Sequence, residues 1–260
     1  MKKGESERRG PHAVAGRDAL AYDGIDLPPP FRAIKLREVG DAFRHAQSIA
    51  LREGAGTLVY VGRYDVIEFA TVLEPDEPLK LARRAFYAGM NALGDALAAI
   101  APPECPIAFK WPGIIHVDGS AVGGARLTWP PGDSEEDPPQ WLIFGASIRT
   151  SCMDRDAQGL PLAAALDEQG FADLAPRRFI GSFARHLMLG VDAWQSIGFS
   201  AVARAYLSRL DSHKGASASI ADNGDLHLKW PGAPQPDRST LLEGLRSPSR
   251  LQPAGMDGRS

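Results

Sequence analysis

Four stretches with the composition of β-strands follow one another without a helix between them, at residues 106–111, 114–118, 121–129 and 141–150. An earlier pair, 57–61 and 66–73, is separated only by Gly62–Asp65, which is short enough for a hairpin. Strands that come in clusters, and do not alternate strictly with helices, favour an α+β fold over a doubly wound sheet. We therefore expect a mixed, largely antiparallel sheet backed by helices.

Helices are expected on either side of this run of strands. From 79 to 100, apolar residues recur at steps of three and four and form one buried stripe, which Pro102-Pro103 ends. Pro176 suits the first turn of a second long helix reaching about Trp194, and an amphipathic piece follows at 199–209. A shorter helix begins after Asp41 as its N-cap and stops at Gly54.

The sequence divides into one large unit and one small one. We expect a disordered segment at 1–30, a main domain at 31–208, a small C-terminal β-rich module at 209–247 and a disordered tail at 248–260. The module is indicated by two short strands around Asp222-Asn223-Gly224, because Asn and Gly tolerate the positive φ of a tight turn. The acidic, proline-rich segment Pro130–Pro139 predicts a solvated loop.

Charge and composition exclude several classes of protein. A formal net charge of -3 gives no basic footprint for nucleic acid, and no apolar run approaches the length of a membrane span. Two cysteines, Cys105 and Cys152, make neither a disulfide framework nor a four-thiol zinc site. His116, His186 and His213 fall on separate elements without the spacing of metal ligands. We expect a cytoplasmic protein without a metal site, and the sequence leaves its oligomeric state open.

The segment from Lys110 to Gly124 reads Lys-Trp-Pro-Gly-Ile-Ile-His-Val-Asp-Gly-Ser-Ala-Val-Gly-Gly. It resembles the central motif of the biotin and lipoate protein ligases, a Lys-Trp-Pro-Asn-Asp strand, a short turn and then Lys-x-x-Gly. The strand Phe144–Arg149 stands where that family has an Ile-Gly-Ile-Gly-Ile-Asn strand. The resemblance covers roughly residues 35–230, so the chain is identified as a divergent member of the superfamily of biotin ligases, lipoate ligases and octanoyltransferases.

The resemblance implies a two-step reaction on the sheet. ATP, with magnesium, would activate biotin, lipoate or a related acid as an acyl-adenylate, and a lysine of a biotinyl or lipoyl carrier domain would then attack it. By the same resemblance, Lys110 and Arg63 would be the catalytic cations. The acyl-adenylate pocket would be lined by Arg63, Trp111, Gly123, Gly124, Gly145 and Ser147.

Three departures from the family motif bear on this chemistry. Ala121 replaces the lysine expected to stabilise the acyl-phosphate, and Gly113-Ile114 replaces the Asn-Asp pair. Gly62–Asp65 is all that stands for the family's Gly-Arg-Gly-Arg loop. Loss of one such donor costs on the order of 10²–10³ in rate. A catalytically inactive member that binds a cofactor-like acid or a carrier protein is therefore an alternative.

Each candidate residue also has a structural interpretation. Arg63 could pair with Asp65 or Glu68, and Lys110 could keep its head in water at a strand edge. Paired glycines at 123 and 124 mark a close approach by a ligand or by another strand, which the sequence leaves open.

Cys152 suggests a third function, an octanoyl or lipoyl transferase with a thiolate nucleophile. Arg149 and Arg155 are near it in the sequence, and cationic neighbours lower the pKa of a thiol. An ordinary free cysteine is the competing interpretation.

Overall fold

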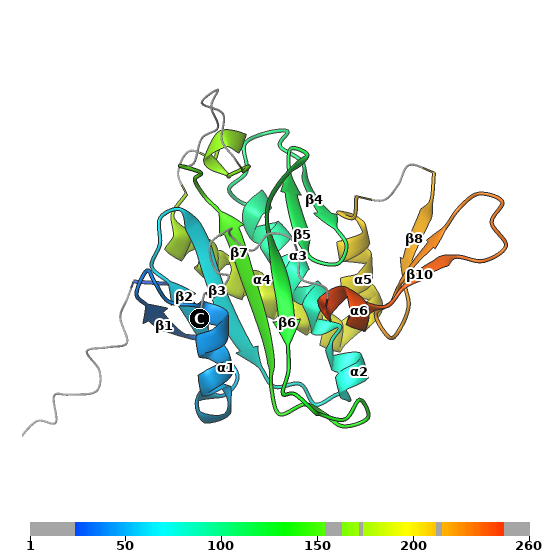
Figure 1. The fold of residues 1–260 in the computed structure, drawn as a ribbon, viewed down its shortest axis with the longest axis horizontal. Helices are drawn as coiled ribbons and strands as arrows, with labels where there is room; N and C mark the ends of the chain where they lie inside the picture. The colour runs from blue at the N-terminus through cyan, green and yellow to red at the C-terminus, as the bar shows by residue number, and fades with distance from the viewer. Residues whose placement is uncertain (1–23, 154–162, 172–173, 212–214, 247–260) are drawn as a thin grey trace, which may run out of the picture.

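A computed structural model describes residues 24–153, 163–171, 174–211 and 215–246 (Figure 1). Within these ranges, seven strands form one sheet in the order β1-β2-β3-β7-β6-β5-β4. Their bounds are Arg32–Leu36 (β1), Thr57–Val61 (β2), Val66–Leu73 (β3), Ile107–Lys110 (β4), Ile114–Val117 (β5), Ser120–Thr128 (β6) and Leu142–Arg149 (β7).

The pairing of the strands confirms a mixed, largely antiparallel sheet. β1 and β2 run parallel, and the other five neighbouring pairs of this sheet are antiparallel. A β-bulge in the pairing of β5 with β6 shifts the register between Ile115 and His116. The predicted hairpin at Gly62–Asp65 joins β2 to β3.

The helices are α1 (Ala42–Glu53), α2 (Leu79–Ala82), α3 (Ala85–Ala98), α4 (Pro176–Ile197) and α5 (Phe199–Leu207). Two hydrophobic cores lie on opposite faces of the sheet, because successive side chains of a strand point to opposite faces. Phe69 of β3 joins the larger core with α3, α4 and α5, and Ala70 beside it joins a smaller core under α1.

Aromatic rings fill much of the larger core. Phe144 of β7 stacks on Phe183 of α4 with ring centroids 5.7 Å apart, and Phe86 of α3 lies 5.9 Å from Phe144. Gly89 of α3 makes room for this group, since a Cβ there would lie 2.3 Å from the Phe144 ring. The close approach of α3 to the sheet therefore depends on a residue without a side chain.

The long helix predicted over 79–100 is interrupted, in contrast to the sequence analysis. α2 ends at Ala82 and α3 begins at Ala85, with the buried residues Arg83 and Arg84 between them. Arg84 donates to Glu77, to the carbonyl of Leu81 and to the carbonyl of Asp222. These polar contacts for a buried cation offset the loss of continuous helical hydrogen bonding.

Two strands were not predicted. β1 is a half-exposed edge strand whose parallel pairing with β2 needs the intervening helix α1, so no local hairpin signal marks it. The three-residue strand β10 (Asp237–Ser239) is too short and polar to carry a periodic pattern.

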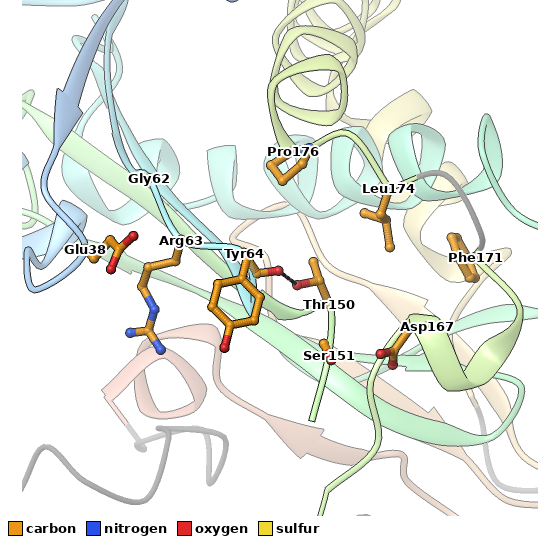
Figure 2. A pocket seen from close by; sticks show the side chains of 10 residues that line it. All are labelled: Glu38, Gly62, Arg63, Tyr64, Thr150, Ser151, Asp167, Phe171, Leu174 and Pro176. Atoms are coloured by element: carbon orange, nitrogen blue, oxygen red, sulfur yellow. Dashed lines mark hydrogen bonds between the residues drawn. The ribbon is translucent and has the colours of Figure 1, made fainter. Parts of the chain in front are cut away.

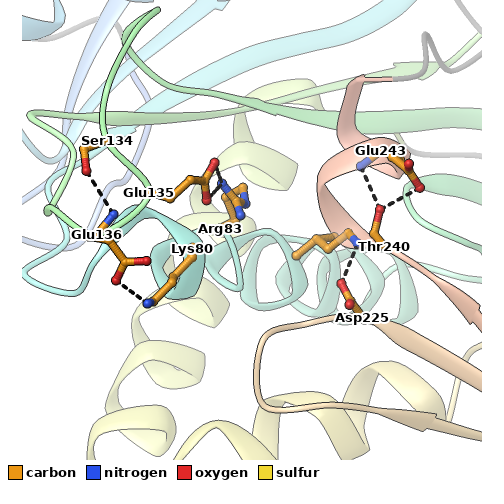
Figure 3. Close-up of polar contacts among 9 residues, drawn as sticks. Lys80, Arg83, Ser134, Glu135, Glu136, Asp225, Thr240 and Glu243 are labelled. Atoms are coloured by element: carbon orange, nitrogen blue, oxygen red, sulfur yellow. Dashed lines mark hydrogen bonds and ion pairs between the residues drawn. The ribbon is translucent and has the colours of Figure 1, made fainter.

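The acidic segment 130–139 is a loop, as predicted, but it is docked on α2 (Figure 3). Lys80 pairs with Glu136, and the buried Arg83 donates to Glu135 at 2.8 Å while lying over the Trp129 ring. The backbone amide of Leu79 donates to the carbonyl of Asp137 at 2.9 Å. The acidic residues of the loop therefore attach it to the start of α2, in addition to keeping it in contact with water.

The C-terminal strands β8 (Ser217–Ile220) and β9 (Leu226–Lys229) form a second small sheet with β10, followed by α6 (Leu241–Arg246). The Asp225 carboxylate accepts the amide of Leu241 at the start of α6 (Figure 3). Leu241 is buried in the larger core, so the small sheet and the main sheet share one hydrophobic interior.

Part of the predicted organisation lies beyond the described residues. Of the segment 1–30, only 24–30 are described, and the predicted tail at 248–260 falls outside. Ile25 and Leu27 pack against the larger core. The helices in the described ranges are each too short or too polar to cross a membrane.

Gly89→Ala should destabilise the protein by about 1–3 kcal/mol, because its Cβ would force the Phe144 ring out of place. Urea denaturation measures this change. Gly190→Ala in α4 is the matched control, since nothing lies within 4 Å of that Cβ and alanine favours a helix by about 0.5–1 kcal/mol. Equal stabilities for both variants would contradict the packing described here.

Candidate functional site

Among the residues that the structure describes, α1 packs on β2, β3 and β7 on one face of the sheet (Figure 1). On β4, β5 and β6 the side chains of this face are half-buried or exposed, whereas most of those on the opposite face are buried. The strand register places one row of residues that runs from β3 and β7, at the edge of the area under α1, across β6, β5 and β4: Glu68, Ser147, Gly124, Ile114 and Lys110. We call this row the open strip.

Two of the predicted site residues meet at the centre of the open strip. Gly124 and Ser147 are a cross-strand pair, and Gly145 is on the same face, two residues before Ser147. Ile114 adds an apolar side chain beside Gly124. The strip therefore offers a floor of small and apolar groups with polar groups at its two ends.

The hollow above Gly145 is filled by the protein itself. A Cβ at Gly145 would lie 2.4 Å from the ring of Phe43, and Phe43 is only 9% exposed. The guanidinium carbon of Arg126 lies 3.9 Å from the centroid of the same ring. Phe43 is thus held between the sheet and a cation, in contact distance for a cation–π interaction.

Charged groups surround this aromatic ring. Glu68 accepts the amide of Ala42 at 2.9 Å, and Asp41 accepts the amide of Arg44, so both carboxylates cap the start of α1. Arg126 lies 3.7 Å from Asp41. Burial raises the pKa of Glu68 and lowers the pKa of Arg126. Because two carboxylates face one guanidinium, the cluster carries no surplus positive charge.

The paired glycines are explained by the close approach of neighbouring backbone. A Cβ at Gly123 would lie 2.3 Å from the carbonyl oxygen of Ser147, and one at Gly124 would lie 2.7 Å from that of Gly113. Gly123 pairs with Ile148, which belongs to the larger core, so it faces away from the open strip. Of the two, Gly124 alone lies on the uncovered face.

Lys110 lies in the open strip but far from the other predicted cation. It is exposed on β4, and its side chain has no partner among the described residues. The backbone of Lys110 on β4 is three strand spacings, roughly 14 Å, from the backbone of Ser147 on β7. Arg63 is beyond the ends of β2 and β3, so the sheet does not bring the two cations together.

Trp111 faces the C-terminal module. Its indole N–H donates to the hydroxyl of Tyr87 at 3.1 Å, and α6 packs on it so closely that a Cβ at Gly244 would lie 2.5 Å from the ring. The Tyr87 hydroxyl donates in turn to the carbonyl of Gly224 at 2.6 Å. Burial raises the pKa of Tyr87.

Arg63 lines a cleft of about 470 Å³ between the β2–β3 turn and the start of α4 (Figure 2). Its guanidinium makes two hydrogen bonds to Asp65, at 3.0 and 2.7 Å, so the predicted pairing with Asp65 is observed. This pairing lowers the pKa of Asp65. The other lining residues are Glu38, Gly62, Tyr64, Thr150, Ser151, Asp167, Phe171, Leu174 and Pro176.

The Cys152 side chain is 7% exposed, next to the cleft residue Ser151. Arg149 donates to the carbonyl of Ala164 and so has a structural partner, and Arg155 lies outside the described residues. His116 and His186 lie on different elements, and His213 lies outside the described residues. No group of three metal-ligating side chains occurs in the part of the chain that is described.

Ala121 pairs with His116 at the bulge and is half-buried on the uncovered face. Phe43, Glu68 and Arg126 border this face as well, and the sequence analysis did not assign them to the site. Arg126 was detectable, because alternation along β6 puts it on the same face as Gly124. Phe43 was not, because its position over β7 depends on how α1 packs.

The sequence matches the biotin/lipoate A/B protein ligase family over residues 27–208, well over half of the chain. The chain belongs to this family. No curated protein sequence matches it significantly.

Solved structures of the family have the same fold. A biotin protein ligase-like protein of unknown function from Silicibacter sp. TM1040 is 24% identical with a TM-score of 0.73, over 86% of this chain and 100% of that one. The biotin protein ligase of Aquifex aeolicus is 15% identical with a TM-score of 0.61, over 81% and 99%. The Leishmania major enzyme in complex with biotinyl-5-AMP is 14% identical with a TM-score of 0.52, over 77% and 95%.

Glu68→Gln should stabilise the protein at pH 7.5, because the ionised carboxylate is penalised by burial and glutamine can still accept the Ala42 amide. The folded-state pKa is raised, so the penalty exists above it and disappears below the unfolded value near 4.5. Urea denaturation at pH 7.5 and pH 4 should therefore show a difference that shrinks in acid. A constant difference would contradict the burial effect.

Proposed function

We propose that this member of the biotin/lipoate ligase family binds a carboxylic acid on the open strip and activates it with ATP for transfer to a lysine of a carrier domain. The main support is the row Ser147–Gly124–Ile114–Lys110 of the open strip. Its residues next to Ser147 have small or apolar side chains, and it ends at a cation that has no side-chain partner among the described residues. Such a row suits an apolar chain ending in a carboxylate.

The chemistry requires positive charge near the reacting phosphate and carbonyl. Lys110 and Arg63 are the cations that would take over this task from the lysine replaced by Ala121, and magnesium bound to ATP would add to them. The structures of relatives with biotin and ATP, or with biotinyl-5-AMP, support an acid and ATP as substrates. To reach a phosphate, the Arg63 guanidinium would have to break its hydrogen bonds with Asp65, or move together with that residue.

A second candidate is a binding protein without ligase chemistry. It is favoured by Ala121, which has no donor where the family places a lysine, and by the bidentate engagement of Arg63 with Asp65. In this case the acid, or a biotinyl or lipoyl carrier domain, would bind the same face without ATP hydrolysis. Thioester chemistry at Cys152 has the least support, because the thiol is buried.

Purified protein with ATP, labelled pyrophosphate and a panel of biotin, lipoate and straight-chain acids should show acid-dependent pyrophosphate exchange. Lys110→Gln should lower the exchange rate by about 10²-fold, the usual cost of losing one charge-stabilising donor. Exchange equal to the acid-free background with every acid would leave only the binding candidate. Cys152→Ser should retain the wild-type rate.

Ala121→Lys should raise the exchange rate about 10-fold or more, because it restores a donor on the uncovered face of β6. Transfer of labelled acid to a lipoyl domain provides the second measurement. Ser219→Lys, which adds the same charge at an exposed position of β8, is the control. An equal effect of both variants would mean that charge alone, and not its position, changed the rate.

A further inference from the structure

The Phe43 ring lies beside the open strip, over Gly145. Gly145 is the one position in the middle of β7 on this face where a missing side chain leaves a hollow, and hollows of this kind admit a ligand or a neighbouring side chain. Here the Phe43 ring occupies it, at 2.4 Å from where a Cβ would stand. A ligand over Ser147 and Gly124 therefore meets a wall on its Gly145 side.

The wall is held in place from three directions. Gly145 lies beneath the ring, Arg126 lies over it at 3.9 Å, and the start of α1 is fixed by the hydrogen bond from Ala42 to Glu68. Phe43 also belongs to the smaller core, with Ala46 and Ile49 on the same helix. Rotation of the ring out of the hollow would break the cation–π contact and expose apolar area.

The charges indicate the direction of the ligand. Asp41 and Glu68 already face Arg126, so a carboxylate gains little at that end of the strip. Lys110 at the other end has no side-chain partner among the described residues. Between Ser147 and Lys110 the floor is Gly124 and the apolar Ile114, across roughly 14 Å.

We propose that Phe43, clamped between Gly145 and Arg126, excludes acids with a fused-ring head group and restricts this site to straight-chain carboxylic acids, whose carboxylate points to Lys110. This inference rests on acid binding by the open strip and names the class of acid. Phe43 is a specificity-determining residue that touches the acyl chain and takes no part in the reaction.

Isothermal titration of the full chain with octanoate and with biotin tests the inference without ATP. The wild type should bind octanoate at least tenfold more tightly than biotin. Phe43→Ala should gain at least tenfold in biotin affinity, because the hollow over Gly145 opens, while octanoate affinity changes less than threefold. Lys110→Gln should weaken octanoate binding at least tenfold.

Ile49→Ala is the matched control, because it truncates a buried residue of the same helix and the same core without opening the hollow. Circular dichroism checks that each variant is folded, and Phe43→Leu, with an expected gain of at least threefold, replaces Phe43→Ala if that variant does not fold. The inference is overturned by equal affinities of the wild type for both acids, by no gain of biotin affinity in the Phe43 variant, or by the same gain in Ile49→Ala.

Absence of binding by both acids in every variant also overturns the inference, since Phe43→Ala then gains nothing. Ligase activity is judged separately, by pyrophosphate exchange with the wider panel of acids. Pyrophosphate exchange by the wild type with a ring-containing acid would support the ligase function and contradict the proposed role of Phe43 in specificity.

Discussion

The packing of α1 on the sheet determines which part of that face is open to a ligand. The helix buries Ala42, Phe43, Ala46, Ile49 and Ala50 against β2, β3 and β7. A helix with its side chains is about 10–12 Å wide, while seven strands at their usual spacing span roughly 29 Å. One helix therefore covers two or three strands, and on this face the remaining described strands keep an accessible surface, while α3, α4 and α5 belong to the larger core on the opposite face.

Much of this arrangement could be predicted from the sequence. Strands β2 and β3, the caps Asp41 and Gly54, and the start of α4 at Pro176 follow from local signals, and the structure agrees with them. The break at Arg83-Arg84 could not be predicted, because it depends on partners more than fifty residues away, Glu135 and Asp222. β1 was missed for a similar reason, since the strand with which it pairs, β2, follows it in the chain only after the helix α1.

The candidate site was predictable in part. The Lys-Trp-Pro motif identified the family, and the resemblance assigned Gly124 and Ser147 to one pocket, where the structure pairs them across two strands. In a sequence, however, paired glycines look the same whether they make room for a ligand or for another part of the protein. At 123 and 124 the cause is the backbone of Ser147 and Gly113, and at 145 it is the ring of Phe43. The two kinds of glycine can be distinguished only from the tertiary structure, which shows which atoms lie next to each of them.

The Tyr87 hydroxyl connects residues from three distant parts of the chain. It accepts from Trp111 and donates to Gly224, which is 137 residues further along. Contacts of such long sequence separation form slowly, because the loop between them must be closed first. During synthesis, the turn after Lys110 therefore lacks this support until Gly224 has left the ribosome.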